Sequence, residues 1–226
     1  KKQVWNIMGN NYNPRIVTDG LLLCYDMNVP QCYPGTGTTI YNLADSTNYP
    51  SMSPHTSDSA NLAYIDFVTT NPGYVKLIKG TTSSVNNEDN FLRGSGGIRG
   101  TLDNNFTTMG WMLRTDSSKS TILSYRQVWT RLEFAVSNSV MYFSQRQTAS
   151  PYTTNTTSVS VTNSLNVWDH YALVKIGVGA QVTSSWKFYK NGVLLATNSF
   201  AMDETMSEGG GYYHIGAAWS DDDYIV

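Results

Sequence analysis

The sequence predicts an all-β protein built as a two-sheet antiparallel sandwich, with no helix of ordinary length. Charged residues make up only 14% of the 226 residues, and Ser, Thr and Asn fill polar positions where a helical protein would use Glu and Lys. Tyr (15), Trp (6) and Gly (18) are plentiful, as expected for strands and the turns between them. About a dozen short apolar stretches are separated by turn signals, which is typical of a sandwich.

The clearest element is a hairpin at residues 186–200, WKFYKNGVLLATNSF. Its two alternating runs are joined by Asn191-Gly192, and both residues tolerate the positive φ that a type I′ turn requires. This turn predicts three facing pairs, namely Lys190 with Val193, Phe188 with Leu195, and Trp186 with Thr197. The side chains expected on the core-facing side are those of Trp186, Phe188, Val193 and Leu195.

The chain before the first strand is interpreted as an extended arm or linker over residues 1–18, because Gly9, Pro14 and several Asn residues interrupt any periodicity. The chain starts with Lys1 instead of Met, so we expect a processed product or a piece of a longer polypeptide. Residues 19–226 are then one β domain.

Strands are expected wherever apolar residues alternate between turn signals. In chain order they are residues 21–26, 40–43, 62–68, 74–78, 106–113, 121–125, 131–136, 140–145, 168–176 and 212–217. The first of them, LLLCYD, should be a central strand. Residues 44–61 and 86–100 should be loops, and residues 153–162 could be an exposed strand or a loop. Gly110 indicates a bulge or a close backbone approach.

Seven stretches carry a family resemblance when taken in order: IVTDGLLLCYD, YPGTGTTIYNLAD, FTTMGWMLR, TILS, WDHYALVK, WKFYKNGVLLAT and YYHIGAA. The series resembles the laminin G-like or concanavalin A-like jelly rolls, especially those of bacteriophage and other viral particle proteins. The resemblance implies two curved antiparallel sheets, with Trp111 and Trp168 as core or sheet-surface landmarks. Family members continue past the last matched strand, so a final strand is expected to be truncated or to lie outside the given sequence.

Composition argues against several functions. The net charge is −2, the pI is near 5.9 and no Lys/Arg cluster occurs, so nucleic acid is not expected as a partner. No apolar run approaches the roughly 20 residues that span a bilayer, so membrane insertion is not expected. Cys24 and Cys32 are the only cysteines, and two free thiols are favoured over a disulfide.

Catalysis is not expected either. Hydrolases of related fold place carboxylates on one strand as E-x-D-x-E, and this chain has no such pattern. It has only four glutamates, Glu88, Glu133, Glu204 and Glu208, and its three histidines, His55, His170 and His214, lie in separate elements. Neither a nucleophile elbow nor a zinc motif occurs. A polysaccharide hydrolase is therefore the least favoured hypothesis.

Two kinds of binding site remain possible. Calcium prefers oxygen ligands, and the run Asp221, Asp222 and Asp223, with Asp203 and Glu204, could supply them; a solvated acidic loop is the favoured interpretation, so no cofactor is expected and calcium is the open case. Glycans stack on exposed aromatic rings. The candidate rings are Tyr33, Tyr41, Tyr49, Trp129, Tyr152 and Trp219.

The leading functional hypothesis is a non-enzymatic structural or adhesion module on a virion surface, such as a capsid decoration, fibre or tail-associated protein. Its expected partners are copies of itself or other virion proteins, with weak binding to host cell-surface glycans. The alternative is a carbohydrate-binding, lectin-like module of a cellular or secreted protein. Either function places the domain on a virion surface or outside the cell.

Overall fold

The structure is a computed structural model that describes residues 20–44, 47, 51–55, 65–70, 73–77, 91–95, 104–117, 119–126, 130–147, 154–179, 182–202 and 211–216. These residues form fourteen strands and no helix. No described segment is a helix long and apolar enough to cross a membrane. The predicted arm at residues 1–18 lies outside the described residues.

The larger sheet has eight antiparallel strands in the order β1-β2-β5-β14-β7-β8-β9-β10. Their bounds are β1 Ile40–Tyr41, β2 Ser51–His55, β5 Phe91–Ser95, β14 Tyr212–Ile215, β7 Ser120–Arg126, β8 Thr130–Ser137, β9 Val140–Gln147 and β10 Thr154–Ser160.

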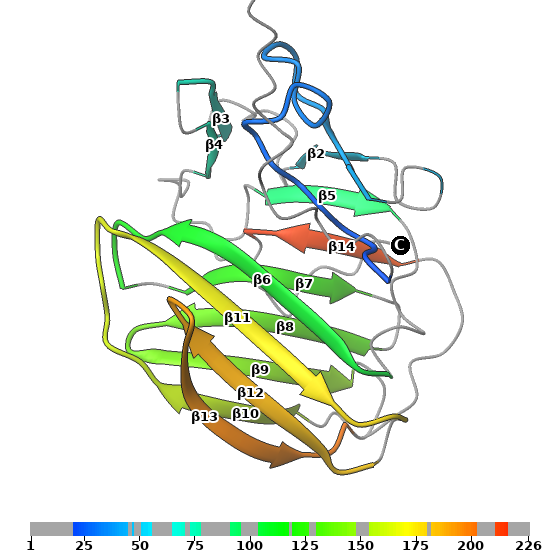
Figure 1. Cartoon of the computed structure of the whole chain (residues 1–226), viewed down its shortest axis with the longest axis vertical. Coiled ribbons are helices and arrows are strands. Elements are labelled where there is room, and N and C mark those ends of the chain that lie inside the picture. Colours follow the sequence, from blue (N-terminus) through cyan, green and yellow to red (C-terminus); the bar gives the residue numbers. More distant parts are fainter. Residues whose placement is uncertain are drawn as a thin grey trace, which may run out of the picture.

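The smaller sheet has four antiparallel strands in the order β13-β12-β11-β6. Their bounds are β13 Val193–Phe200, β12 Ser184–Lys190, β11 Trp168–Ile176 and β6 Phe106–Leu113. Figure 1 shows this sheet lying over β7 to β10 of the larger sheet. A separate ribbon consists of β3 (Ile65–Val68) and β4 (Tyr74–Leu77). The predicted two-sheet antiparallel sandwich is confirmed.

The core fills the space between the two sheets and is centred on Trp186. Its indole ring stacks on Phe143 of the larger sheet, with ring centroids 4.4 Å apart, and meets the edges of Phe106 and Phe200 at 5.8 and 5.7 Å. Its Nε1 donates a hydrogen bond to the Phe200 carbonyl at 3.0 Å, so the one polar atom of the ring is satisfied inside the core.

The hairpin between β12 and β13 is confirmed at its turn and wrong in part of its register. Asn191 and Gly192 have φ values of 50° and 78°, as a type I′ turn requires, and Lys190 pairs with Val193. A bulge at Phe188/Tyr189 then shifts the ladder by one residue. Phe188 pairs with Ala196 instead of Leu195, and Trp186 pairs with Asn198 instead of Thr197.

The bulge changes which side chains of β13 face inward. Trp186 and Phe188 are fully buried, as predicted, but Val193 and Leu195 are exposed. The extra residue is Leu195, which has no partner in the ladder, so the alternation is reversed for the residues that follow it. Val193 lies before the bulge and keeps its predicted partner, so the bulge does not account for its exposure. The sequence contains no glycine or proline that would have marked the position.

Most predicted strands occur where they were expected. Residues 106–113 and 168–176 match β6 and β11 residue for residue, and the ambiguous Thr-rich stretch contains strand β10. Both cysteines are free thiols, as favoured, and burial raises the pKa of Cys32 to about 11.

One strand prediction and two loop predictions were wrong. Residues 21–26 form no sheet ladder; their backbone is held by the side chain of Asn42, which accepts from Cys24 N at 2.8 Å and donates to the Leu22 carbonyl at 2.7 Å. The expected loops at 44–61 and 86–100 contain β2 and β5. Pro54 and Gly94 are loop signals in sequence, but each strand is only five residues long and buries an apolar residue, Met52 or Leu92.

The glycine that allows close approach is Gly94, and the prediction for Gly110 was wrong. A Cβ at Gly110 would lie in ordinary contact, 3.6 Å from Ile122 Cγ2, and the ladder between β6 and β11 is regular around it. A Cβ at Gly94 would instead overlap the ring of Tyr213. That ring is fully buried, and its hydroxyl is 2.7 Å from the Tyr25 hydroxyl, so it has no room to move.

We expect Gly94→Ala to lower the free energy of unfolding by about 3 kcal/mol, because the added methyl group overpacks a closed core. The measurement is urea denaturation followed by tryptophan fluorescence. Gly110→Ala is the matched control and should change stability by less than about 0.5 kcal/mol. Equal effects of the two substitutions would contradict the packing described around Tyr213.

Candidate functional site

The candidate site lies on the outer face of the four-stranded sheet, where large apolar side chains meet solvent. Side chains of a strand alternate between its two faces, and on β6 this alternation turns Trp111 outward with Met109 and Leu113. On β11 it turns Trp168 and His170 outward, whereas the alternate residues of that strand point into the core.

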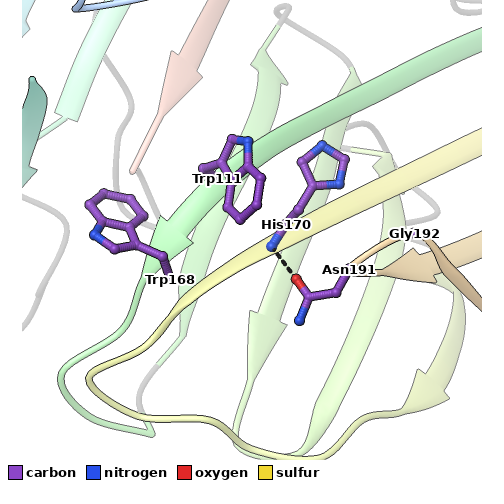
Figure 2. A pocket seen from close by; sticks show the side chains of 5 residues that line it. All are labelled: Trp111, Trp168, His170, Asn191 and Gly192. Carbon is purple, nitrogen blue, oxygen red and sulfur yellow. Dashed lines mark hydrogen bonds between the residues drawn. The ribbon is translucent and has the colours of Figure 1, made fainter. Parts of the chain in front are cut away.

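These side chains surround an open pocket of about 520 Å³, lined by Trp111, Trp168, His170, Asn191 and Gly192. Figure 2 shows the two indoles and the imidazole rising from neighbouring strands beside the hairpin turn. The indole of Trp111 is 67% exposed, and its centroid is 5.2 Å from that of the His170 ring. Trp168 meets Tyr74 of β4 in an edge contact at 5.6 Å.

The hairpin turn is fixed to the edge of the pocket by three hydrogen bonds. His170 N donates to Asn191 Oδ1 at 2.7 Å (Figure 2), and Asn191 N donates to the His170 carbonyl at 2.8 Å. The Asn191 Nδ2 donates to Asp169 Oδ1 at 2.8 Å. A carboxamide has two donor hydrogens and two acceptor lone pairs, so Asn191 keeps one of each for a ligand.

Behind the turn lies a buried ion pair. The carboxylate of Asp169 is 2.9 Å from Lys190 Nζ, and both side chains are largely buried. Lys190 also donates to the Thr162 carbonyl and to Ser164 Oγ, at 2.9 and 2.8 Å. Tyr171 donates to Asp169 Oδ2 at 3.3 Å. The residues behind the pocket, which we call its support, are thus Asp169, Lys190 and Tyr171, and the two charges among them compensate each other.

The ionisation of this support follows from its contacts. Burial acts to raise the pKa of Asp169, but hydrogen bonds from Lys190 and Asn191 and the charge of Lys190 outweigh burial and leave the pKa below its ordinary value. Burial and the neighbouring Asp169 charge raise the pKa of Tyr171 to about 12. Asp169 is thus ionised and Tyr171 neutral at physiological pH.

None of the five residues that line the pocket is a carboxylate, so the pair of carboxylates that a glycosidase uses is missing from its lining. Glu133, the one described glutamate, is on the other sheet, where Thr121 and Lys119 bond its carboxylate at 2.8 and 3.1 Å. Among the described residues no group of three His, Cys, Asp or Glu side chains could hold a metal ion.

Of the rings proposed from the sequence, the two that the structure describes, Tyr33 and Tyr41, do not line this pocket. Tyr33 is buried, stacks on Phe67 with centroids 5.1 Å apart and donates to the Gly37 carbonyl, so no sugar can reach its face. Tyr41 is 48% exposed on β1 of the larger sheet. The remaining candidates lie outside the described residues: Tyr49, Trp129, Tyr152, Trp219, Asp221, Asp222 and Asp223.

Sequence reasoning named Trp111 and Trp168 as landmarks and missed them as site residues. The signal that could have found Trp111 is the alternation Met109, Trp111, Leu113, which places three large apolar side chains on one face of a strand. The inward face of the same strand is also partly apolar, with Phe106 and Met112 packed against the core. Alternation shows which residues share a face, but it does not show which face meets solvent.

Comparison with known proteins identifies the fold but no family. No family model matches the chain, and no curated protein does. Among solved structures, the binding domain of botulinum neurotoxin DC in complex with SialylT matches 89% of this chain and 44% of its own, with TM-score 0.57 and 10% identity. The binding domain of botulinum neurotoxin serotype C1 matches 91% and 45%, with TM-score 0.56 and 11% identity.

A third match is a structure of botulinum neurotoxin type C, a toxin whose cell entry is dependent upon interaction with two ganglioside molecules. It matches 92% of this chain and 45% of its own, with TM-score 0.54 and 12% identity. The chain thus spans less than half the length of these three structures. At identities this low the likeness establishes an all-β fold shared with these binding domains.

Proposed function

We propose that this chain is a non-enzymatic carbohydrate-binding module that stacks a sugar on Trp111. The observation that carries the proposal is the 67% exposed indole at an open pocket that also offers an imidazole and an amide. An exposed aromatic face suits the C–H face of a pyranose ring, and a few placed polar groups fix its hydroxyls. The similar toxin domains, two of them described with SialylT or with gangliosides, support a glycan ligand.

The favoured ligand at this pocket is a neutral sugar. No lining residue is acidic or is Lys or Arg, and the nearby Asp169 is neutralised by Lys190. A carboxylated or sulfated sugar would therefore find no Lys or Arg side chain in the lining to compensate its desolvation. Neither ring stacking nor hydrogen bonding requires a metal, so we propose that binding here is independent of calcium.

We further propose that the module works on a virion surface or outside a cell, as a laminin G-like jelly roll of a viral particle. Support for this setting is the ordered sequence resemblance to such proteins, together with the low charge content. Its partners would be copies of itself or other virion proteins, with cell-surface glycans as the ligand. Purification of the native particle, with detection of this chain by mass spectrometry and immunogold labelling, tests the setting.

We expect Trp111→Ala to weaken binding to a neutral glycan, identified on a glycan array, by at least about tenfold, because an aromatic residue at the centre of a binding site carries much of the affinity. Isothermal titration calorimetry in the presence of EDTA measures the loss and checks the independence from calcium. Trp111 makes few core contacts, so the melting temperature should stay nearly unchanged.

Tyr41→Ala is the matched control, because it removes another exposed ring from the opposite sheet and should leave affinity as it is. If Tyr41→Ala lowers affinity and Trp111→Ala does not, the site is on the other sheet. If no neutral glycan binds the unaltered protein, the proposed function is wrong.

A further inference from the structure

A second group of functional side chains lies on the larger sheet, on its outer face. Strands β2, β5 and β14 run side by side there (Figure 1). In their register Arg93 of β5 stands between Ser53 of β2 and His214 of β14. Because directly paired residues project from the same face of a sheet, these three side chains form a row on the face opposite to that of the core residue Leu92. Within the row Ser53 is exposed, Arg93 is half-buried and His214 is buried.

The guanidinium of Arg93 is held in a fixed orientation. Its Cζ lies 3.5 Å from the ring centroid of Tyr212, and its Nη1 is 2.7 Å from His55 Nε2. A guanidinium can only donate hydrogen bonds, so His55 accepts through Nε2 and is neutral. The His55 ring is fixed in turn, because it stacks on Phe91 with centroids 4.9 Å apart.

The charge of this guanidinium is not compensated within the described structure. The ion pairs there join Lys119 to Glu133 and Lys190 to Asp169, and no described carboxylate lies within ion-pair distance of Arg93. The contact with His55 uses Nη1, which leaves the parallel N–H bonds of Nε and Nη2 directed away from it. This edge matches the two oxygens of a carboxylate.

The surroundings of Arg93 suit a hydroxylated ligand. Ser53, directly opposite on β2, is exposed, and Tyr212 is 41% exposed. Both can exchange hydrogen bonds with sugar hydroxyls beside a bound carboxylate. Arg114 differs from Arg93 in its surroundings, because it is buried and donates hydrogen bonds to the Asn138 carbonyl and to Asn163 Oδ1 within the protein.

We propose that Arg93 binds the carboxylate of a sugar acid through its Nε and Nη2 edge, with Tyr212 and His55 holding the guanidinium and Ser53 contacting the sugar. This site is on the opposite sheet from the Trp111 pocket and does not depend on it. A glycan that carries both neutral and acidic sugars would thus meet two separate binding surfaces of one domain.

The test is a titration of the isotopically labelled protein with glucuronate, N-acetylneuraminate, acetate, sulfate and glucose, followed by amide NMR shifts. The two sugar acids should shift amides of β2, β5 and β14, and glucose should not. Arg93→Lys keeps the charge but removes the planar fork, so it should weaken glucuronate binding by at least about tenfold. Lys187→Gln, which removes a charge from the opposite sheet, should leave binding unchanged.

A second variant keeps the test valid should Arg93→Lys unfold. Ser53→Asp places a carboxylate directly across from Arg93, where it should occupy the fork, support the fold and abolish glucuronate binding. Equal shifts from acetate would overturn the assignment to a sugar acid, and equal shifts from sulfate would overturn the preference for a carboxylate. If none of the anions shifts these strands, Arg93 is not a binding site.

Discussion

Asp169→Ala is expected to lower the free energy of unfolding by about 3 to 5 kcal/mol and to abolish glycan binding at the Trp111 pocket. The substitution leaves the ammonium of Lys190 buried without its counter-ion, which is among the most costly single changes in a protein interior. It also removes the acceptor that holds Asn191 Nδ2 at 2.8 Å, so the turn bordering the pocket loses one of its three fixing hydrogen bonds. Urea denaturation and calorimetric titration measure the two effects.

A double-variant cycle with Lys190→Met is the control for this result. Removing both charges eliminates the uncompensated ammonium, so Asp169→Ala should cost clearly less in the Lys190→Met background than alone. Acid provides an independent check. Because the folded pKa of Asp169 lies below its ordinary value of 3.8, the stabilisation is present above about pH 5 and disappears as the pH falls through the folded value. Equal costs in both backgrounds would contradict coupling of the pair.

Trp186→Ala is expected to be similarly damaging, with a loss of about 3 to 5 kcal/mol, because it empties the centre of the core between the sheets. The indole stacks on Phe143 of the facing sheet and touches the edges of Phe106 and Phe200. These contacts disappear together, and the Phe200 carbonyl loses its donor. Thermal unfolding by circular dichroism measures the loss.

Trp111→Ala is the matched control for the core substitution, because it makes the same chemical change on the outer face of the same sheet. With its indole two-thirds exposed, that variant should stay within about 0.5 kcal/mol of the unaltered protein. If the two tryptophan variants unfolded at the same denaturant concentration, the assignment of inner and outer faces would be wrong.

The fold class was predictable because it depends on features that act locally. Asn191-Gly192 specifies its turn through backbone conformation alone, and the alternation in β6 and β11 follows from strand geometry. Errors arose where distant contacts decide. Five-residue strands such as β2 and β5 form because neighbouring strands pair with them. The backbone of residues 21–26 forms hydrogen bonds with the side chain of Asn42 instead of pairing with a strand.

The site was less predictable for the same reason. Candidate rings were sought in loops, where exposure is usual, and Tyr33 proved to be buried against Phe67. Trp111 lies within a strand, and its exposure depends on the absence of a third layer over the smaller sheet in the described structure. No property of the sequence around Trp111 encodes that arrangement. Arg93 escaped notice because β5 itself was interpreted as a loop.

The contacts of Asn198 bear on how copies of this domain behave at high concentration. Its Nδ2 donates to Thr157 Oγ1 at 3.0 Å and to the Ser158 carbonyl at 2.9 Å, and so ties β13 to β10, the last strand of each layer on that side. An exposed edge strand has unpaired backbone groups, with which a strand of another molecule can pair, and such pairing can lead to aggregation. Here the side chain of Asn198 connects the two edge strands, so another chain would have to break its hydrogen bonds to β10 before it could pair there.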